Sequence, residues 1–247
     1  MQRPRGRQEL IADSTRRRYR EHTTAGRPGG ALLLALGLAL ANPARGADDG
    51  LELSRFPEEG LTGWEHERFE NETRYRIVDA GGTRVLEARA CDAASGLFRK
   101  IDVDLERTPV LEWRWWVDAP IAGPDPTTRA GDDFAARVYV VFSGGIAFWR
   151  STALVYVWGS AQAPSMPWRN PFTDRAAMVV VERGTPGDGH LRAVRRNVPE
   201  DYRERFGTEP PAVRAVAVMT DTDQTGTCAT ARYAELRFLP ATEDPPP

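Results

Sequence analysis

Leu111-Glu-Trp-Arg-Trp-Trp-Val117 and Gly131-Asp-Asp-Phe-Ala-Ala-Arg-Val-Tyr-Val-Val-Phe142 are the two stretches that decide the fold. Apolar and polar residues alternate along both, and a period of two is the repeat of a β-strand that buries one of its faces. The alternation predicts that one side of these strands faces the core, with Leu111, Trp113, Trp115, Val117, Phe134, Val138, Val140 and Phe142. Both stretches are therefore predicted to be strands of a sheet with one buried side.

Charged and aromatic residues occupy the other side of the same strands, and the strand predicted at 151–159 adds two more aromatic rings. Flat rings match the apolar faces of sugars, while Arg and Asp hydrogen-bond to their hydroxyl groups. The pattern predicts a ligand-binding face made of Arg114, Trp116, Asp132, Asp133, Arg137, Tyr139, Tyr156 and Trp158. The alternative is a cross-strand ladder, in which arginines stack on tryptophan and pair with carboxylates only to stabilise a solvent face.

Strand signals recur every ten to fifteen residues after the first fifty positions, separated by Gly, Pro, Asp and Asn. The predicted strands are 51–56, 73–79, 83–90, 96–104, 109–118, 133–143, 151–159, 175–184, 190–197, 212–220 and 230–239. One helix is predicted at 199–206, with a proline in its first turn and Gly207 after its end. This order predicts an all-β protein, an antiparallel, jelly-roll-like β-sandwich with one short helix, forming a single domain over residues 47–240.

Residues 1–46 resemble a basic leader followed by a secretory signal peptide. The apolar run Ala31–Ala41 is too short for a permanent membrane span, and it follows the arginines Arg16, Arg17, Arg18, Arg20 and Arg27. Cleavage is predicted after Gly46, with Ala41 as the alternative, and an uncleaved anchor is the competing interpretation. We therefore predict an exported, periplasmic protein with no integral membrane span after cleavage, and a disordered tail at 241–247.

The composition excludes several classes of partner and site. The chain has 33 basic and 35 acidic residues, and the basic ones are concentrated in the leader, so the mature domain is acidic and nucleic acid is not a predicted partner. No Cys–His spacing typical of zinc occurs, nor does a Ser-His-Asp arrangement, a phosphate-binding Gly loop or a dinucleotide fingerprint. The predicted partners are a glycan or another envelope protein.

Four aspartates, Asp132, Asp133, Asp221 and Asp223, lie where loops meet predicted strands. Carboxylate oxygens suit calcium, which is the only cofactor that the sequence indicates. Two of the same carboxylates would alternatively serve as the acid and base of a glycoside hydrolase, with Asp133 paired with Asp221 or Asp223. Carboxylates in loops more often cap turns, and this third interpretation also stays open.

Cys91 and Cys228 are the only cysteines, and both lie in the predicted mature domain. An oxidising compartment permits a disulfide between them, provided that the two strand ends beside them are neighbours. The alternative is two isolated small residues.

Several blocks together resemble the bacterial exported family known as domain of unknown function 3047. They are Leu111–Trp115, Gly131–Phe142, Tyr156–Trp158, Arg196–Val198 with Asp201-Tyr202 and Phe206-Gly207, and Ala217–Asp223. The resemblance covers about 51–240 and implies export and a sandwich fold, but no activity. The motifs are also similar to jelly-roll carbohydrate-binding modules and galactose-binding-like domains.

The leading hypothesis is a non-catalytic β-sandwich that binds a polar ligand, specifically a glycan, through the face described above. One alternative is an envelope-polysaccharide hydrolase or lyase that uses the paired aspartates. The other is a structural or assembly partner in the cell envelope, which needs only an exposed patch.

Overall fold

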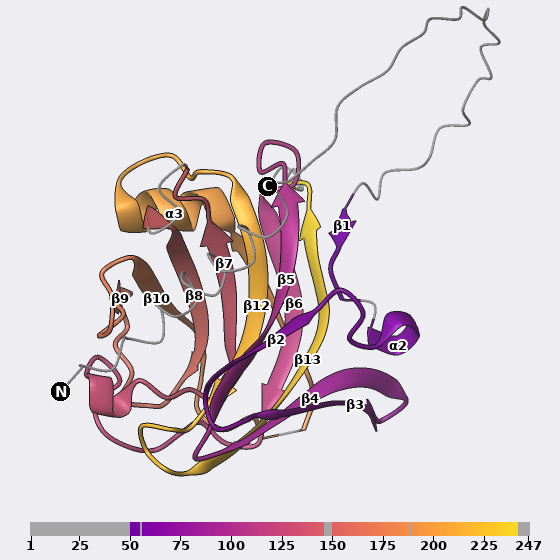
Figure 1. The fold of residues 1–247 in the computed structure, drawn as a ribbon, viewed down its shortest axis with the longest axis vertical. Helices are drawn as coiled ribbons and strands as arrows, with labels where there is room; N and C mark the ends of the chain where they lie inside the picture. Colours follow the sequence, from indigo (N-terminus) through magenta and orange to yellow (C-terminus); the bar gives the residue numbers. More distant parts are fainter. Residues whose placement is uncertain (1–49, 55, 146–149, 188, 242–247) are drawn as a thin grey trace, which may run out of the picture.

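The computed structural model describes residues 50–54, 56–145, 150–187 and 189–241, and the predicted leader lies outside these ranges. Two sheets form a β-sandwich (Figure 1). The first sheet has the order β11 (Arg192–Asn197), β6 (Val110–Val117), β13 (Cys228–Leu239), β4 (Thr83–Cys91) and β3 (Arg74–Ala80), and β1 (Leu51–Glu52) pairs with β13. The predicted sandwich is confirmed.

The second sheet is longer and contains one parallel pair of strands. Its order is β2 (Glu65–Glu70), β5 (Ala94–Val103), β12 (Val213–Asp221), β7 (Arg137–Phe142), β8 (Thr152–Gly159), β10 (Ala176–Arg183) and β9 (Trp168–Arg169). Strands β8 and β10 run parallel, whereas the other described pairs are antiparallel. Strands β2 and β9 were not predicted, nor was the four-residue helix α2 (Phe56–Glu59).

The core lies between the two sheets. Strand β6 contributes Trp113 and Trp115, both fully buried, and they pack against Tyr156 and Trp158 of β8 at ring-centroid distances of 5.2 and 5.7 Å. Leu111 and Val117 are buried in the same cluster. Alternation along β6 therefore gives the core face that the sequence predicts.

Helix α3 (Val198–Phe206) lies at one end of the sandwich (Figure 1). The Asn197 side chain accepts a hydrogen bond from the backbone N–H of Glu200, and Gly207 ends the helix in the left-handed conformation, φ 70°. Tyr202 packs on Phe142 with ring centroids 4.5 Å apart, which fixes the helix to the end of β7. No helix in the described part of the chain is long and apolar enough to span a membrane.

Strand β7 begins at Arg137 instead of residue 133, because the chain bends sharply before it. A Cβ atom on Gly131 would lie 2.3 Å from the carbonyl oxygen of Asp125, so only glycine fits this close approach. The bend changes the period, and Phe134 joins a second apolar cluster on the outward side of the second sheet. Its predicted place beside Val138 in the core is wrong.

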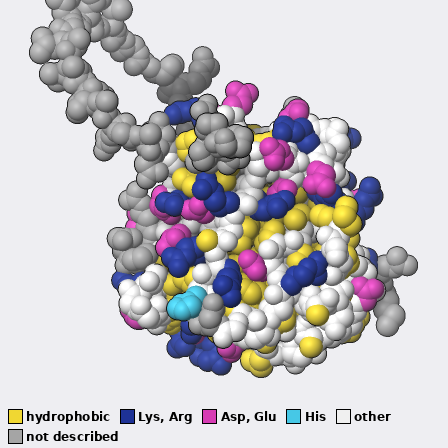
Figure 2. Space-filling view, turned by 180° about the vertical axis from the view of Figure 1, so that it is seen from behind, with side chains coloured by type: hydrophobic (Ala, Val, Ile, Leu, Met, Phe, Trp, Pro, Cys, Tyr) yellow, Lys and Arg dark blue, Asp and Glu magenta, His cyan; other side chains and the backbone are white. Residues whose placement is uncertain are grey.

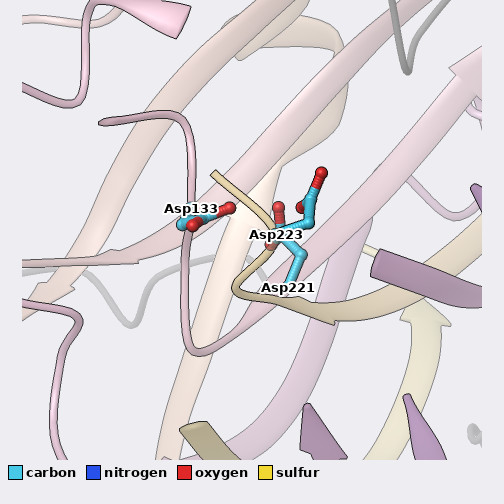
Figure 3. Close-up of side chains that lie close together, drawn as sticks. All are labelled: Asp133, Asp221 and Asp223. Atoms are coloured by element: carbon cyan, nitrogen blue, oxygen red, sulfur yellow. The ribbon is translucent and has the colours of Figure 1, made fainter. Parts of the chain in front are cut away.

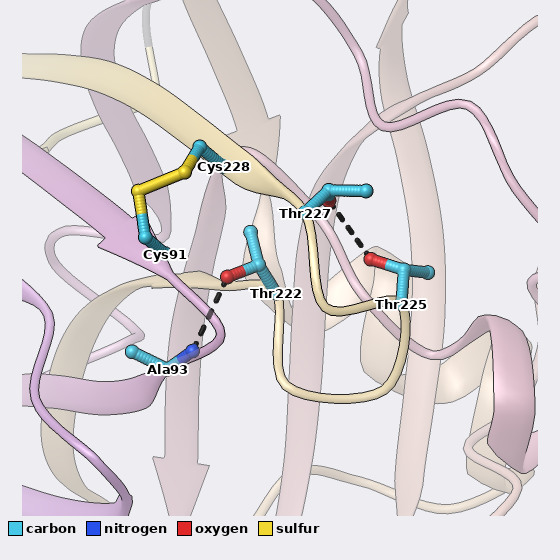
Figure 4. Close-up of a disulfide and its surroundings, with 6 residues drawn as sticks. All are labelled: Cys91, Ala93, Thr222, Thr225, Thr227 and Cys228. Atoms are coloured by element: carbon cyan, nitrogen blue, oxygen red, sulfur yellow. Dashed lines mark hydrogen bonds between the residues drawn. A yellow bond between two sulfur atoms is a disulfide. The ribbon is translucent and has the colours of Figure 1, made fainter.

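Cys91 and Cys228 are direct partners in the β4–β13 register and form a disulfide (Figure 4). Two connections between the sheets meet beside it. The backbone N–H of Thr222 donates to the carbonyl oxygen of Ala93, and the Thr222 hydroxyl accepts from the Ala93 N–H at 3.3 Å. The disulfide therefore joins strand ends at the corner where both connections cross.

Candidate functional site

Arg137 is fully buried and binds two aspartates. Its guanidinium donates to both carboxylate oxygens of Asp221, at 2.7 and 2.5 Å, and to Oδ1 of Asp132 at 3.2 Å. It also lies 4.6 Å from the ring centroid of Phe134. Burial opposes the charged form, but Asp132 and Asp221 outweigh it and raise the pKa of Arg137 well above its ordinary value. Arg137 is thus a buried cation that connects Asp132, in the bend before β7, to Asp221 at the end of β12.

Asp133 binds the turn that follows β12. Its Oδ2 atom accepts hydrogen bonds from the backbone N–H groups of Gln224, at 3.0 Å, and Thr225, at 2.7 Å. The residue is only 4% exposed, and burial together with the nearby charge of Asp221 raises its pKa to about 6. Its carboxyl group therefore caps the turn, while burial and the charge of Asp221 disfavour its ionised form.

Three of the four predicted metal ligands meet at this corner (Figure 3). One carboxylate oxygen from each of Asp133, Asp221 and Asp223 lies within 4.8 Å of the others, whereas Asp132 is bound by Arg137 and by Asn170. Calcium takes six to eight oxygen ligands, and here a guanidinium already binds both oxygens of Asp221. The donor set does not fit a calcium ion, because Arg137 supplies the compensating charge.

The same contacts bear on the predicted acid–base pair. Asp221 is fully buried, and its two oxygens face Arg137 instead of a surface that a substrate could reach. Asp221 is therefore placed as the ion-pair partner of Arg137 and not as the acid or base of a substrate-binding cleft.

The predicted single ligand-binding face is not present, because the structure divides its residues among four surroundings: the core, the outward side of the second sheet, the outward side of the first sheet, and the Arg137–aspartate cluster described above. Tyr156 and Trp158 face the core, where they donate hydrogen bonds to Asp201 and to the carbonyl oxygen of Gly184, both at 2.7 Å. Tyr139 is buried in the outward cluster of the second sheet. The reason is that β6 belongs to the first sheet and β8 to the second, so residues expected side by side point toward each other across the core or away from it.

Arg114 and Trp116 do face outward, on the first sheet, and they belong to a cross-strand ladder. Arg114 pairs with Glu235 at 2.9 Å, and the guanidinium of Arg232 lies 4.8 Å from the ring centroid of Trp116. Figure 2 shows basic side chains interspersed with acidic ones and apolar area over the back of the molecule. For these two residues, the structure has the ladder geometry that the sequence left as an alternative.

A cavity of about 450 Å³ lies at the edge of the sandwich, where β2 of the second sheet and β3 of the first sheet are found. It is lined by Leu61, Trp64, His66, Glu72, Arg74, Tyr75 and Leu97. Sequence reasoning missed it because β2 reads Glu-His-Glu-Arg-Phe-Glu, without the apolar alternation that marks a strand. The cluster of Trp64, His66 and Phe69 within this charged stretch was the one available signal.

Three polar side chains of this edge cavity, those of His66, Tyr75 and Glu72, are held in place by hydrogen bonds or an ion pair. Nε2 of His66 lies 2.8 Å from the Ser95 hydroxyl, and the Tyr75 hydroxyl donates to the Ser95 carbonyl oxygen at 2.6 Å. Burial raises the pKa of Tyr75 well above its ordinary value, so this hydroxyl stays neutral. Glu72 pairs with Arg68 at 2.9 Å. The cavity thus combines aromatic area with oriented polar groups.

Several solved structures are similar to this chain at low sequence identity. The family 11 carbohydrate-binding module of the cellulase Lic26A-Cel5E of Clostridium thermocellum is 11% identical, covers 78% of this chain and 96% of its own, and has a TM-score of 0.44. The carbohydrate-binding module CBM28, specific for non-crystalline cellulose, is 14% identical, with coverages of 74% and 90% and a TM-score of 0.43. The xyloglucanase domain of an effector from Sinorhizobium fredii is 10% identical, with coverages of 77% and 95% and a TM-score of 0.41.

No curated protein sequence matches the chain. The family model described as "Protein of unknown function (DUF3047)" matches residues 62–237, a segment that contains the Arg137 cluster, the disulfide and all but one of the residues that line the edge cavity. The chain therefore belongs to the DUF3047 family.

Proposed function

We propose that this protein is an exported, non-catalytic β-sandwich that binds a sugar in the edge cavity. The observation that carries the proposal is the lining of that cavity, where Trp64 and Tyr75 lie beside His66, Glu72 and Arg74. Small-ligand sites are concave and combine aromatic side chains with a few oriented polar groups, and their volumes start near 300 Å³. A pyranose ring presents both kinds of surface, with apolar C–H faces and hydroxyl groups around its edge.

Export is supported by two features of the chain. The basic residues and the apolar run at Ala31–Ala41 have the order of a secretory signal, and a disulfide persists in an oxidising compartment such as the periplasm. Signal cleavage and periplasmic location remain part of the proposal, and N-terminal sequencing of the protein recovered from the periplasm tests both.

The binding proposal is tested by a glycan-array screen of the purified protein, followed by titration of the best ligand against variants. His66→Ala removes an exposed cavity side chain, so the fold should survive while affinity falls about ten-fold or more. Trp64→Ala removes aromatic area and should cause a similar loss. Arg114→Ala is the matched control, because Arg114 lies in the ladder on the first sheet.

Other outcomes assign the function elsewhere. If His66→Ala and Trp64→Ala bind normally and Arg114→Ala does not, the ligand lies on the ladder and the cavity proposal is wrong. New reducing ends released from the array glycans would instead establish the hydrolase alternative. No glycan signal, together with a stoichiometric protein partner on purification, would favour the assembly role.

A further inference from the structure

Two arginines lie directly opposite each other at the edge of the first sheet. Arg74 of β3 is the register partner of Arg89 in β4, and both side chains are exposed. Like charges directly opposite on neighbouring strands destabilise a sheet. Within the described ranges, neither guanidinium has an ion-pair partner, so this unfavourable pair is not compensated there.

The rest of the sheet shows how its arginines are normally compensated. Five others share three glutamates, at distances between 2.5 and 3.7 Å: Arg76 and Arg232 with Glu87, Arg195 and Arg237 with Glu112, and Arg114 with Glu235. Against this pattern, two adjacent arginines without a carboxylate indicate a place for an anion supplied from outside the protein.

Arg74 also lines the edge cavity. The one carboxylate among the lining residues, Glu72, is already paired with Arg68. The cavity thus has an aromatic wall for a ring and one lining guanidinium, that of Arg74, whose register partner on β4 is Arg89. Neither guanidinium pairs with a carboxylate among the described residues. A guanidinium binds a planar carboxylate through two parallel N–H donors, which a neutral hydroxyl group cannot match.

We infer that the sugar bound in the cavity is acidic, with its carboxylate held by Arg74 and Arg89. The inference rests on the proposed function and specifies its ligand class as a uronic-acid-containing glycan. Its ring would contact Trp64 and Tyr75, while its carboxylate would bind Arg74 in the cavity wall and Arg89 on the neighbouring strand.

The test compares two matched ligands, trigalacturonate and the neutral trisaccharide made by reducing its three carboxyl groups. Isothermal titration of the wild-type protein should give at least ten-fold tighter binding of the acidic trimer at low salt. This preference should shrink in 0.5 M NaCl, because salt screens exposed charges. Arg74→Ala and Arg89→Ala should each reduce the preference several-fold and leave the melting temperature unchanged or slightly raised, since each relieves the like-charge pair.

Arg214→Ala is the control, because it removes an exposed arginine of the second sheet that pairs with Asp102 and lies outside the cavity. It should keep the full preference for the acidic trimer. Equal binding of both trimers by the wild-type protein would overturn the acidic-ligand inference while leaving sugar binding intact. Failure of both trimers, and of every neutral glycan on the array, would instead remove the proposed function. A preference that survives Arg74→Ala and Arg89→Ala unchanged would also overturn the inference, because the anion would then bind elsewhere.

Discussion

Asp133 is the residue whose charge opposes the fold most clearly. Its pKa in the folded protein is raised to about 6, so the folded state holds this proton more tightly than the unfolded chain does. The tighter binding of this proton stabilises the folded state fully below about pH 4. The stabilisation is lost as the pH rises through about 6. Asp133→Asn keeps an oxygen acceptor for the N–H groups of Gln224 and Thr225 and removes the charge.

We therefore expect Asp133→Asn to be more stable than the wild type by about 3 kcal/mol at pH 7.5, and about equal to it at pH 4. Urea unfolding at both pH values measures the difference. Calcium provides the control, because a bound cation would favour ionised Asp133. If calcium raised the melting temperature of the wild type but not that of Asp133→Asn, the result would contradict the interpretation that Arg137 supplies the compensating charge. It would then support the predicted calcium site.

Arg137 has the opposite role, since its charge is required. Arg137→Ala leaves Asp132 and Asp221 buried without their cation, and breaking a buried ion pair costs about 3–5 kcal/mol. The sequence placed Arg137 on a ligand-binding face, where its removal would cost binding and leave the fold intact, whereas the buried contacts lead us to expect loss of stability. Chemical denaturation distinguishes the two. An Arg137→Ala protein with normal stability and no glycan affinity would restore the original hypothesis.

At the scale of elements, the disulfide joins strands that are 137 residues apart in the chain. Closing so long a loop restricts the unfolded chain, and native disulfides typically contribute about 2–4 kcal/mol. We expect Cys91→Ala/Cys228→Ala to lose about this much unfolding free energy, with the largest increase in hydrogen exchange at the 222–227 turn, because Thr222 and Thr227 bond to residues 92–93 at the same corner. Unchanged exchange at this turn would show that the backbone contacts hold the corner alone.

Element prediction succeeded where burial alternates and failed where it does not. Strand β6 was placed within one residue because every second side chain is buried in the core. Strand β2 was missed because its residues are intermediate or exposed, so no apolar period marks it. Strand β7 was started four residues early, since the bend at Gly131 depends on the nearby Asp125 backbone, which residue types alone do not show.

At the scale of the whole molecule, the proposed sugar site depends on the edge of the sandwich. Strands β2 and β3 belong to different sheets, and the cavity lies where these two edge strands occur. The cavity is lined by residues of both sheets. Which side chains line it therefore depends on which strand forms the edge of each sheet.

The sequence by itself determined the sandwich, the alternating core face of β6, the helix that ends at Gly207 and the family, because each is encoded by local periodicity or by a contiguous motif. It also indicated that the aspartates of segments 131–136 and 221–226 could form a site, and carboxylate oxygens of three of them do lie close together. Only the tertiary structure decided that Arg137, Tyr156 and Trp158 are buried, that Arg74 faces Arg89, and that a cavity forms beside them. These facts depend on which sheet each strand joins and in what register. Strand pairing between distant segments sets both, and a one-residue change in it exchanges the two faces of a strand.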